Sequence, residues 1–387
     1  MIQHVVDLVL AAAVAAHDGC DTPGLAAYAL VTSDVIHTKS TIMHHGFWFQ
    51  PGHVSALGST DLLQWWDDWH RSRGQRMVPH KLCIINACKQ ENVQVLDWWY
   101  AWHKDHGVPF PSCPPMGYWS GLAEASLAEH WDVLEWWKRM HREHGVPFHV
   151  EDKAVDRASG DGNISLLDWW WDLHKTDGLP FRYSKWSLAL ASAHGRMESL
   201  DWWWDKHVHH GVTLQYDGAV DQASGAGQLA ALQWWWAKST LTGATIAFHY
   251  TQSSVSNAAG HGHTHILDWW WHMHKTHNLE FKYTSRAIVY STSFGRTNSL
   301  DWFWNLSTQE GDVPMKYSRD AFDWSSRHAQ LAALDWWKDK VNHGARASWG
   351  RVRKNCAMEG YNQVPDATLV WWATHGPTLL PQAFSDQ

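Results

Sequence analysis

The sequence lacks the motifs that most often reveal catalysis. It contains no Gly-x-Ser-x-Gly nucleophile turn, no phosphate-binding glycine-rich loop and no dinucleotide-binding fingerprint. Cysteine is also scarce, because the 387 residues hold only five, which are scattered and odd in number. Such cysteines are typical of reduced thiols inside cells. We therefore expect a cytoplasmic or, alternatively, nuclear protein that is not an enzyme and needs no cofactor.

Positive charge and long apolar runs are missing as well. Lys and Arg total 31 against 39 Asp and Glu, which gives a formal charge of −8 with His neutral, and no Lys/Arg run occurs. A nucleic-acid partner requires a basic stripe, so we expect none. No segment reaches the ~18 apolar residues of a membrane span, so we expect no membrane insertion. The apolar residues 5–16 follow no basic segment and contain Asp7, which argues against a signal peptide.

Tryptophan is the residue that the sequence has in excess, with 32 copies. Many follow a leucine in a pattern whose fullest form is Leu-Asp-Trp-Trp-Trp at residues 200–204. The leucines that begin the copies are Leu63, Leu96, Leu134, Leu167, Leu200, Leu232, Leu267, Leu300, Leu334 and Leu369. The steps between them are 33, 38, 33, 33, 32, 35, 33, 34 and 35 residues. This spacing indicates stacked repeats, each packed on its neighbours, rather than one globular core.

One clean repeat, residues 183–211, shows what each unit contains. Ser184 is placed to cap a first short helix, which should end near Gly195. A second helix should cover residues 198–210 and end at Gly211, because glycine suits the left-handed position after a helix. A link of the Val-Pro-Phe or Phe-Lys-Tyr type joins successive units; its copies are residues 108–110, 146–148, 179–183, 212–216, 279–283 and 313–317.

The periodicity of the second helix predicts which residues form the core. At 100° per residue, Leu200, Trp203 and Trp204 fall on one side of the helix. Trp202 then lies on a flank, and Asp201 belongs to a solvent-facing acidic ridge, which does not indicate catalysis. The expected core residues are Leu167, Trp170, Trp171, Leu200, Trp203, Trp204, Leu267, Trp270 and Trp271.

These features together resemble ankyrin-repeat proteins. The family shares the two short helices, the 33-residue step, a glycine between the helices and a His-Gly pair near the end of the second helix. The glycines here are Gly162, Gly195, Gly227, Gly262 and Gly295, and the pairs are His106-Gly107, His144-Gly145, His210-Gly211 and His343-Gly344. The resemblance covers about residues 55–376. It implies an all-α, ankyrin-like solenoid of about nine to ten helix-turn-helix repeats.

The resemblance is divergent in both helices. The family's usual Thr-Pro-Leu-His start is replaced by Tyr-Ser or Tyr-Thr followed by small residues such as Ala191-Ser192, and its Leu-Leu by Trp-Trp. This variant is similar to predicted ankyrin-like repeat proteins of lower fungi. The resemblance implies a curved solenoid that binds other proteins on its concave side, through links and first helices, and it transfers no chemistry.

The pattern divides the chain into three parts. Residues 1–50 lack the Trp copies and are expected to form a helical cap or, alternatively, a short adaptor segment. Residues 51–376 are the Trp-rich ankyrin-like repeat domain. Residues 377–387 are a C-terminal tail, because Gly376 and Pro377 interrupt the last copy.

Histidine is the strongest candidate for metal binding, since the sequence has 29. Four pairs lie three residues apart, on one helix face: His103/His106, His141/His144, His207/His210 and His274/His277. Two ligands do not make a site, and no third ligand recurs at a matching position. We therefore expect no metal and interpret these His as favourable groups at the negative end of each helix, with a ladder of metal ions as the alternative.

The leading functional hypothesis is a non-enzymatic scaffold that binds a protein partner through its links and first helices. The expected contact residues are Arg182, Lys185, Trp186, Gln215, Lys282, Arg286, Lys316 and Arg319. Their positive side chains favour an acidic partner surface.

Two alternatives rest on the tryptophans. Exposed Trp could drive self-association into a structural, filament-forming assembly, because head-to-tail contacts between solenoids need not close. Stacked Trp could also form a ladder that absorbs ultraviolet light, or bind a ligand through the ring faces.

Overall fold

The computed structural model describes residues 51–77, 82–110, 121–147, 151–241, 245–309, 313–318, 320–342 and 365–379. All regular secondary structure in these ranges is α-helical. The expected cap or adaptor at residues 1–50 lies outside the described residues. The expected tail at 377–387 begins inside α23 (Asp366–Leu379), because that helix continues through Gly376 and Pro377.

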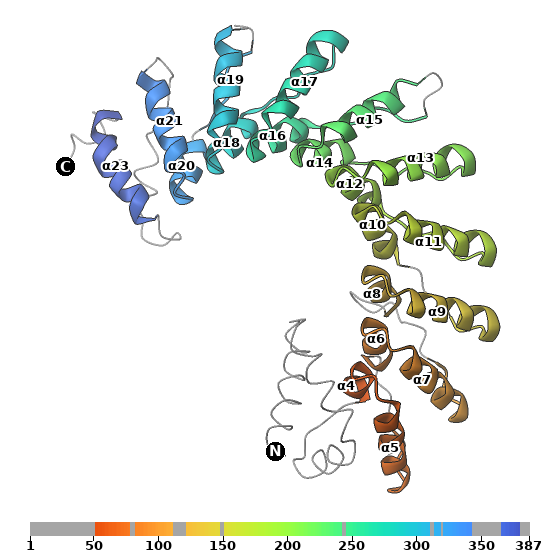
Figure 1. Cartoon of the computed structure of the whole chain (residues 1–387). Coiled ribbons are helices and arrows are strands. Elements are labelled where there is room, and N and C mark those ends of the chain that lie inside the picture. The colour runs from red at the N-terminus through yellow and green to blue at the C-terminus, as the bar shows by residue number, and fades with distance from the viewer. Residues whose placement is uncertain are drawn as a thin grey trace. The chain divides into compact units, whose positions relative to one another are not determined.

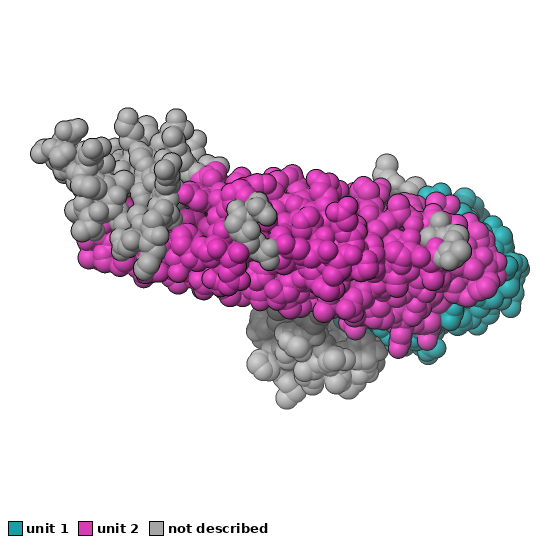
Figure 2. All heavy atoms as spheres, turned by 90° about the horizontal axis from the view of Figure 1, so that it is seen from above, with its two compact units in different colours: residues 1–154, 168–182 teal, residues 155–167, 183–387 magenta. Residues whose placement is uncertain are grey.

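The chain divides into two compact units (Figure 2). Unit 1 comprises residues 1–154 and 168–182, and unit 2 comprises residues 155–167 and 183–387. The helices of unit 1 are α4 (Pro51–Ala56), α5 (Thr60–Arg71), α6 (Leu82–Lys89), α7 (Val93–Asp105), α8 (Gly121–Leu127), α9 (Trp131–His144) and most of α11 (Ile164–Asp177).

Unit 2 repeats the same alternation of a shorter first helix and a longer second helix (Figure 1). Its first helices are most of α10 (Asp152–Asp161), then α12 (Lys185–Ala193), α14 (Ala219–Gly225), α16 (Gln252–His261), α18 (Ser285–Ser293) and α20 (Asp320–Arg327). Its second helices are α13 (Met197–His210), α15 (Leu229–Ser239), α17 (Thr264–His277), α19 (Thr297–Gln309), α21 (Leu331–Asn342) and α23. Successive first helices pack side by side, and so do successive second helices from α15 onward.

The helix ends confirm the local sequence signals. The hydroxyl of Ser184 accepts a hydrogen bond from the backbone N–H of Trp186 and caps α12. The second helix α13 ends at Gly211, which has a φ of 72° in the left-handed region. The short helices therefore begin and end where the capping residues predict.

Small residues allow the first helices to pack closely. Gly260 of α16 lies against Tyr290 of α18, and a Cβ atom at Gly260 would be 2.9 Å from the Cβ of Tyr290. The neighbouring Ala258 and Ala259 are fully buried. Because any larger side chain would separate the helices, the small residues in the first helices are a packing requirement of the stack.

A buried aspartate in one first helix caps the next one. Asp156 of α10 accepts the backbone N–H of Ser184 at 2.9 Å and its hydroxyl at 2.5 Å, and it also accepts the hydroxyl of Ser187. Asp221 of α14 makes the corresponding three bonds to Thr251 and Ser254 of the next repeat. Both carboxylates therefore join consecutive repeats with charge-assisted hydrogen bonds.

In most copies the second Trp is hydrogen-bonded to the first helix of the preceding repeat. In α13, the indole N–H of Trp203 donates to the hydroxyl of Ser159 at 2.9 Å, and both side chains are fully buried. The other described pairs of this kind are Trp99 with Ser55, Trp137 with the sulfur of Cys88, Trp235 with Ser192, Trp270 with Ser224, Trp337 with Thr292 and Trp372 with Ser326. A buried indole N–H is thereby given an acceptor.

One repeat departs from this arrangement at both partners together. Phe303 of α19 takes the place of the second Trp, and Ala259 of α16 takes the place of the hydroxyl residue. Both are buried. Phenylalanine has no N–H to donate, and alanine has no hydroxyl that would need a partner. The paired change is what coupling between the indole donor and the hydroxyl acceptor predicts, because an unmatched buried polar group is costly.

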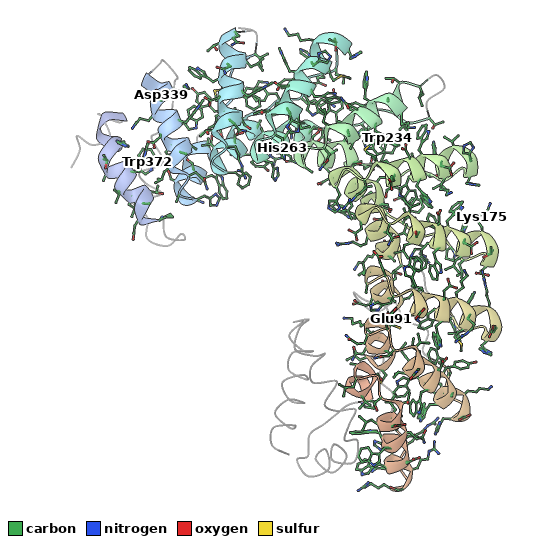
Figure 3. The ribbon with its side chains drawn as sticks, viewed as in Figure 1. Glu91, Lys175, Trp234, His263, Asp339 and Trp372 are labelled. Atoms are coloured by element: carbon green, nitrogen blue, oxygen red, sulfur yellow. The ribbon has the colours of Figure 1, made fainter. Side chains whose placement is uncertain are left out.

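In most copies the first Trp is hydrogen-bonded to the preceding second helix. In unit 2 the indole N–H of Trp234, which lies on α15 (Figure 3), donates to Asp201 at 2.8 Å, and that of Trp302 donates to Asp268 at 2.7 Å. The other described pairs are Trp98 with Gln64, Trp136 with Asp97, Trp169 with Glu135, Trp336 with Asp301 and Trp371 with Asp335. The acidic ridge is therefore exposed but serves as the acceptor row for the next repeat.

Candidate protein-interaction surface

The structure divides the Trp residues differently from the helical-wheel expectation. Leu167, Leu200, Leu267, Trp170, Trp203 and Trp270 are buried, as expected for core residues. Trp171, Trp204 and Trp271, also expected in the core, are half-buried, whereas the first Trp is mostly buried, with Trp202 7 % and Trp234 8 % exposed. Helical periodicity assigns a single buried side to the second helix. In the stack this helix also contacts the neighbouring repeats on its flank, and these repeats cover the first Trp.

The third Trp packs beside the link of its own repeat. The ring centroid of Trp271 lies 5.1 Å from that of His274 and 5.4 Å from that of Phe281, and Trp171 has the same two kinds of neighbour. Trp204 contacts the first Trp of the following repeat, with 6.1 Å between the ring centroids of Trp204 and Trp234. These rings are part of the packing and are not a free aromatic surface.

The recurrent histidine of the second helix holds the link in place. The Nδ1 atoms of His141, His174, His207 and His274 lie 2.7 to 2.9 Å from the carbonyl oxygen five residues later. A carbonyl can only accept, so Nδ1 carries the proton in each ring. Within the described residues, no group of three or more potential ligands is placed to hold a metal ion. Sequence reasoning attributed these His to the helix dipole and missed this hydrogen bond.

The link residues expected to contact a partner are partly engaged within the chain. The Lys282 amine donates to the carbonyl of Tyr250 at 3.0 Å, and the Lys316 amine to that of Tyr283 at 3.1 Å. Gln215 approaches the carbonyl of Tyr183 in the same way, at 3.5 Å. The tyrosines pack beneath the links, and burial raises the pKa of Tyr283 well above its usual range. Link residues thus stabilise the stack as well as lining its surface.

The remaining expected contact residues lie at the start of first helices. Arg182, Lys185 and Arg286 are exposed, and Trp186 is 48 % exposed beside Lys185. Arg319 lies outside the described residues. These side chains are accessible, and they surround the N-terminal ends of α12 and α18.

A second group of exposed aromatic and basic side chains lies on the later first helices of unit 2. Phe294 is 49 % exposed and Trp324 is 44 % exposed. The Phe294 ring lies 6.1 Å from Tyr290 and stacks 6.5 Å from His261, while the Arg286 guanidinium lies 5.7 Å from the Tyr290 ring. We name the following residues the aromatic–basic patch: His261, Arg286, Tyr290, Phe294, Arg296 and Trp324.

The surroundings of this patch are free of acidic residues in two consecutive first helices. Residues 252–265 and 285–298 contain no Asp or Glu, although the whole chain has 39. His263 lies where α16 joins α17 (Figure 3), and its pKa is lowered by burial and by the neighbouring His261, His265 and Arg296. Among the described residues, no carboxylate forms an ion pair with Arg286 or Arg296. These two helices thus add basic but no acidic side chains to the patch, whereas α20 also carries Asp320 and Asp323.

Sequence reasoning identified Arg286 but missed Tyr290, Phe294 and Trp324. The sequence signal that could have identified Tyr290 and Trp324 is their position in the first helices. Tyr290 and Trp324 stand at the sixth position after the expected cap, where other first helices carry Leu190 and Asn257. Only the packing of α18 against both α16 and α20 shows that these positions lie on neighbouring helices.

No protein-family model matches the chain, and no curated protein matches it. Among the described residues, none of the helices has the length and apolar character that crossing a membrane requires.

Proposed function

We propose that this protein is a non-enzymatic, ankyrin-like repeat scaffold that binds a partner protein through its links and first helices. The observation that carries the proposal is the contrast between its aromatic side chains. Trp203 and Trp234 on second helices are buried and hydrogen-bonded within the chain, whereas Trp186, Phe294 and Trp324 on or beside first helices are exposed. Exposed aromatic and Arg side chains together are characteristic of protein-binding surfaces.

Site-specific photo-cross-linking tests this proposal. A photoreactive amino acid is placed at Trp186 or Arg286 on first helices and, as matched controls, at Lys104 or Lys175 on second helices, all of which are exposed. Cells that produce each variant are irradiated. We expect cross-links to another protein from the first-helix positions only. Equal cross-linking from both sets, or none from the first helices, would contradict the proposal.

The last described helix, α23, favours self-assembly as a second candidate function. Its Leu369 is 42 % exposed, although the corresponding Leu300 and Leu334 are fully buried. Val370, which is 65 % exposed, stands where the preceding repeat has the indole acceptor Asp335. An apolar surface of this kind can support head-to-tail contacts between copies.

Sedimentation velocity separates the two candidates. The chain and a Val370→Asp variant are compared across concentration at about pH 7.5 and about pH 5.5, because titration of His changes the charge between these values. The scaffold proposal predicts a monomer throughout. Concentration-dependent assembly that Val370→Asp removes would instead support the self-assembling structural protein.

A further inference from the structure

We propose that the aromatic–basic patch on α16, α18 and α20 binds an extended acidic segment of a partner protein that carries an apolar anchor residue. This inference rests on the proposed scaffold function and adds the chemistry of the partner. It concerns a different part of unit 2 from the α12 region around Trp186.

The patch combines an apolar surface of aromatic rings with two arginine side chains. Phe294, the C-cap residue of α18, lies one turn after Tyr290, and the ring of His261 extends the surface onto α16. Arg286 lies at the start of α18, over the Tyr290 ring, and Arg296 follows the end of the helix. An apolar side chain of the ligand can therefore rest on Phe294 while carboxylates reach the two guanidinium groups.

The charge pattern selects an acidic ligand. Bidentate pairing with carboxylates is the strongest interaction available to an exposed Arg, and aromatic packing beneath Arg286 holds its planar group in place. Residues 252–265 and 285–298 offer no carboxylate to compete for the two guanidinium groups, and the acidic residues of the third helix are Asp320 and Asp323. Neighbouring helix axes lie about 8 to 10 Å apart, so three helices span roughly 20 Å, which is about six extended residues.

A single-stranded nucleic acid is the other ligand that aromatic and Arg side chains can bind. It is disfavoured because such binding depends on a continuous basic groove that follows the backbone. This chain has no Lys/Arg run and a formal charge of −8. The patch offers two Arg side chains on α18 and its following loop, and Arg327 lies 5.6 Å from the Trp324 ring on α20; so few basic groups suit a short peptide better than a polyanion.

The experiment selects peptides of about twelve residues from a random display library on the whole chain. The tightest enriched peptide is then measured by fluorescence polarisation against the unaltered chain and two charge-reversed variants. One variant is Arg286→Glu with Arg296→Glu. The matched control is Lys104→Glu with Lys175→Glu, two exposed positions in unit 1. Circular dichroism confirms that both variants are folded.

We expect the enriched peptides to be rich in Asp and Glu around an apolar residue. Reversing the two Arg should weaken binding about tenfold or more, and the control should change it less than about twofold. Raising NaCl from about 50 to about 500 mM should also weaken binding. A Phe294→Ala variant should lose affinity without losing the salt dependence.

Three outcomes would overturn the inference. These are the absence of enriched peptides, neutral or basic peptides that tolerate the Arg reversal, and preferential Arg-dependent binding of an oligothymidine. The photo-cross-linking result remains independent of each. Cross-links from first helices combined with neutral peptides would refute the acidic ligand and leave the scaffold intact, whereas absent cross-links would refute the scaffold itself.

Discussion

Aromatic residues serve opposite purposes in the second helices and on the later first helices of unit 2. In the second helices, Trp203 and Trp234 are covered by neighbouring repeats, and each indole N–H has an acceptor there. On the first helices, Phe294 and Trp324 remain about half exposed. The difference teaches that aromatic content does not mark a binding surface by itself. An aromatic side chain is buried where the neighbouring repeat packs over it and, for Trp, also accepts a hydrogen bond from the indole N–H.

The largest expected effect comes from removing a buried Trp. Trp203→Ala should lower the free energy of unfolding by about 3 to 5 kcal/mol, because it leaves a large cavity and removes the indole N–H that donates to the Ser159 hydroxyl. Urea unfolding followed by circular dichroism measures this loss. A decrease below about 1 kcal/mol would show that the second Trp does not hold the repeats together.

The next effect tests the carboxylate that caps the following helix. Asp156→Ala should cost about 2 to 3 kcal/mol, since it removes the acceptor of the Ser184 N–H and of two hydroxyls. Asp217→Ala, at an exposed position of the same unit, is the matched control and should change stability by less than about 0.5 kcal/mol. An equal decrease in the free energy of unfolding of the two variants would show that Asp156 does not stabilise the junction between repeats.

The exceptional repeat allows a smaller and more specific test. Phe303→Trp should destabilise the chain by about 1 to 3 kcal/mol, because it buries an N–H group opposite Ala259, which cannot accept it. Adding Ala259→Ser should restore about 1 kcal/mol by supplying the hydroxyl found in the other repeats. If the double variant is no more stable than Phe303→Trp alone, the indole and hydroxyl are not energetically coupled.

The smallest effect should come from an exposed Trp given the same substitution as the first test. Trp186→Ala should change the free energy of unfolding by no more than about 0.5 kcal/mol, because nearly half of the side chain is already in water. The same urea titration checks it. A loss approaching that of Trp203→Ala would mean that the first-helix face belongs to the core and is not free to bind a partner.

Part of the fold could be predicted because its signals are local. The cap at Ser184, the left-handed Gly211 and the Leu-Asp-Trp-Trp spacing follow from backbone geometry and helical periodicity. The burial of the first Trp and the half-burial of Trp204 could not be predicted, because they depend on how far a neighbouring repeat reaches over the helix. For the same reason, the sequence did not identify Tyr290 and Phe294 as candidate contact residues.

The sequence by itself determined an all-helical chain of consecutively packed repeats, since a 33-residue period and capping residues are properties of the chain read in one dimension. Tertiary structure alone decided which residue pairs join the repeats. Trp203 meets Ser159 across 44 positions, and nothing in either local pattern requires that contact. It arises because a second helix lies against the first helix of the preceding repeat, and in that buried contact an indole N–H requires an acceptor.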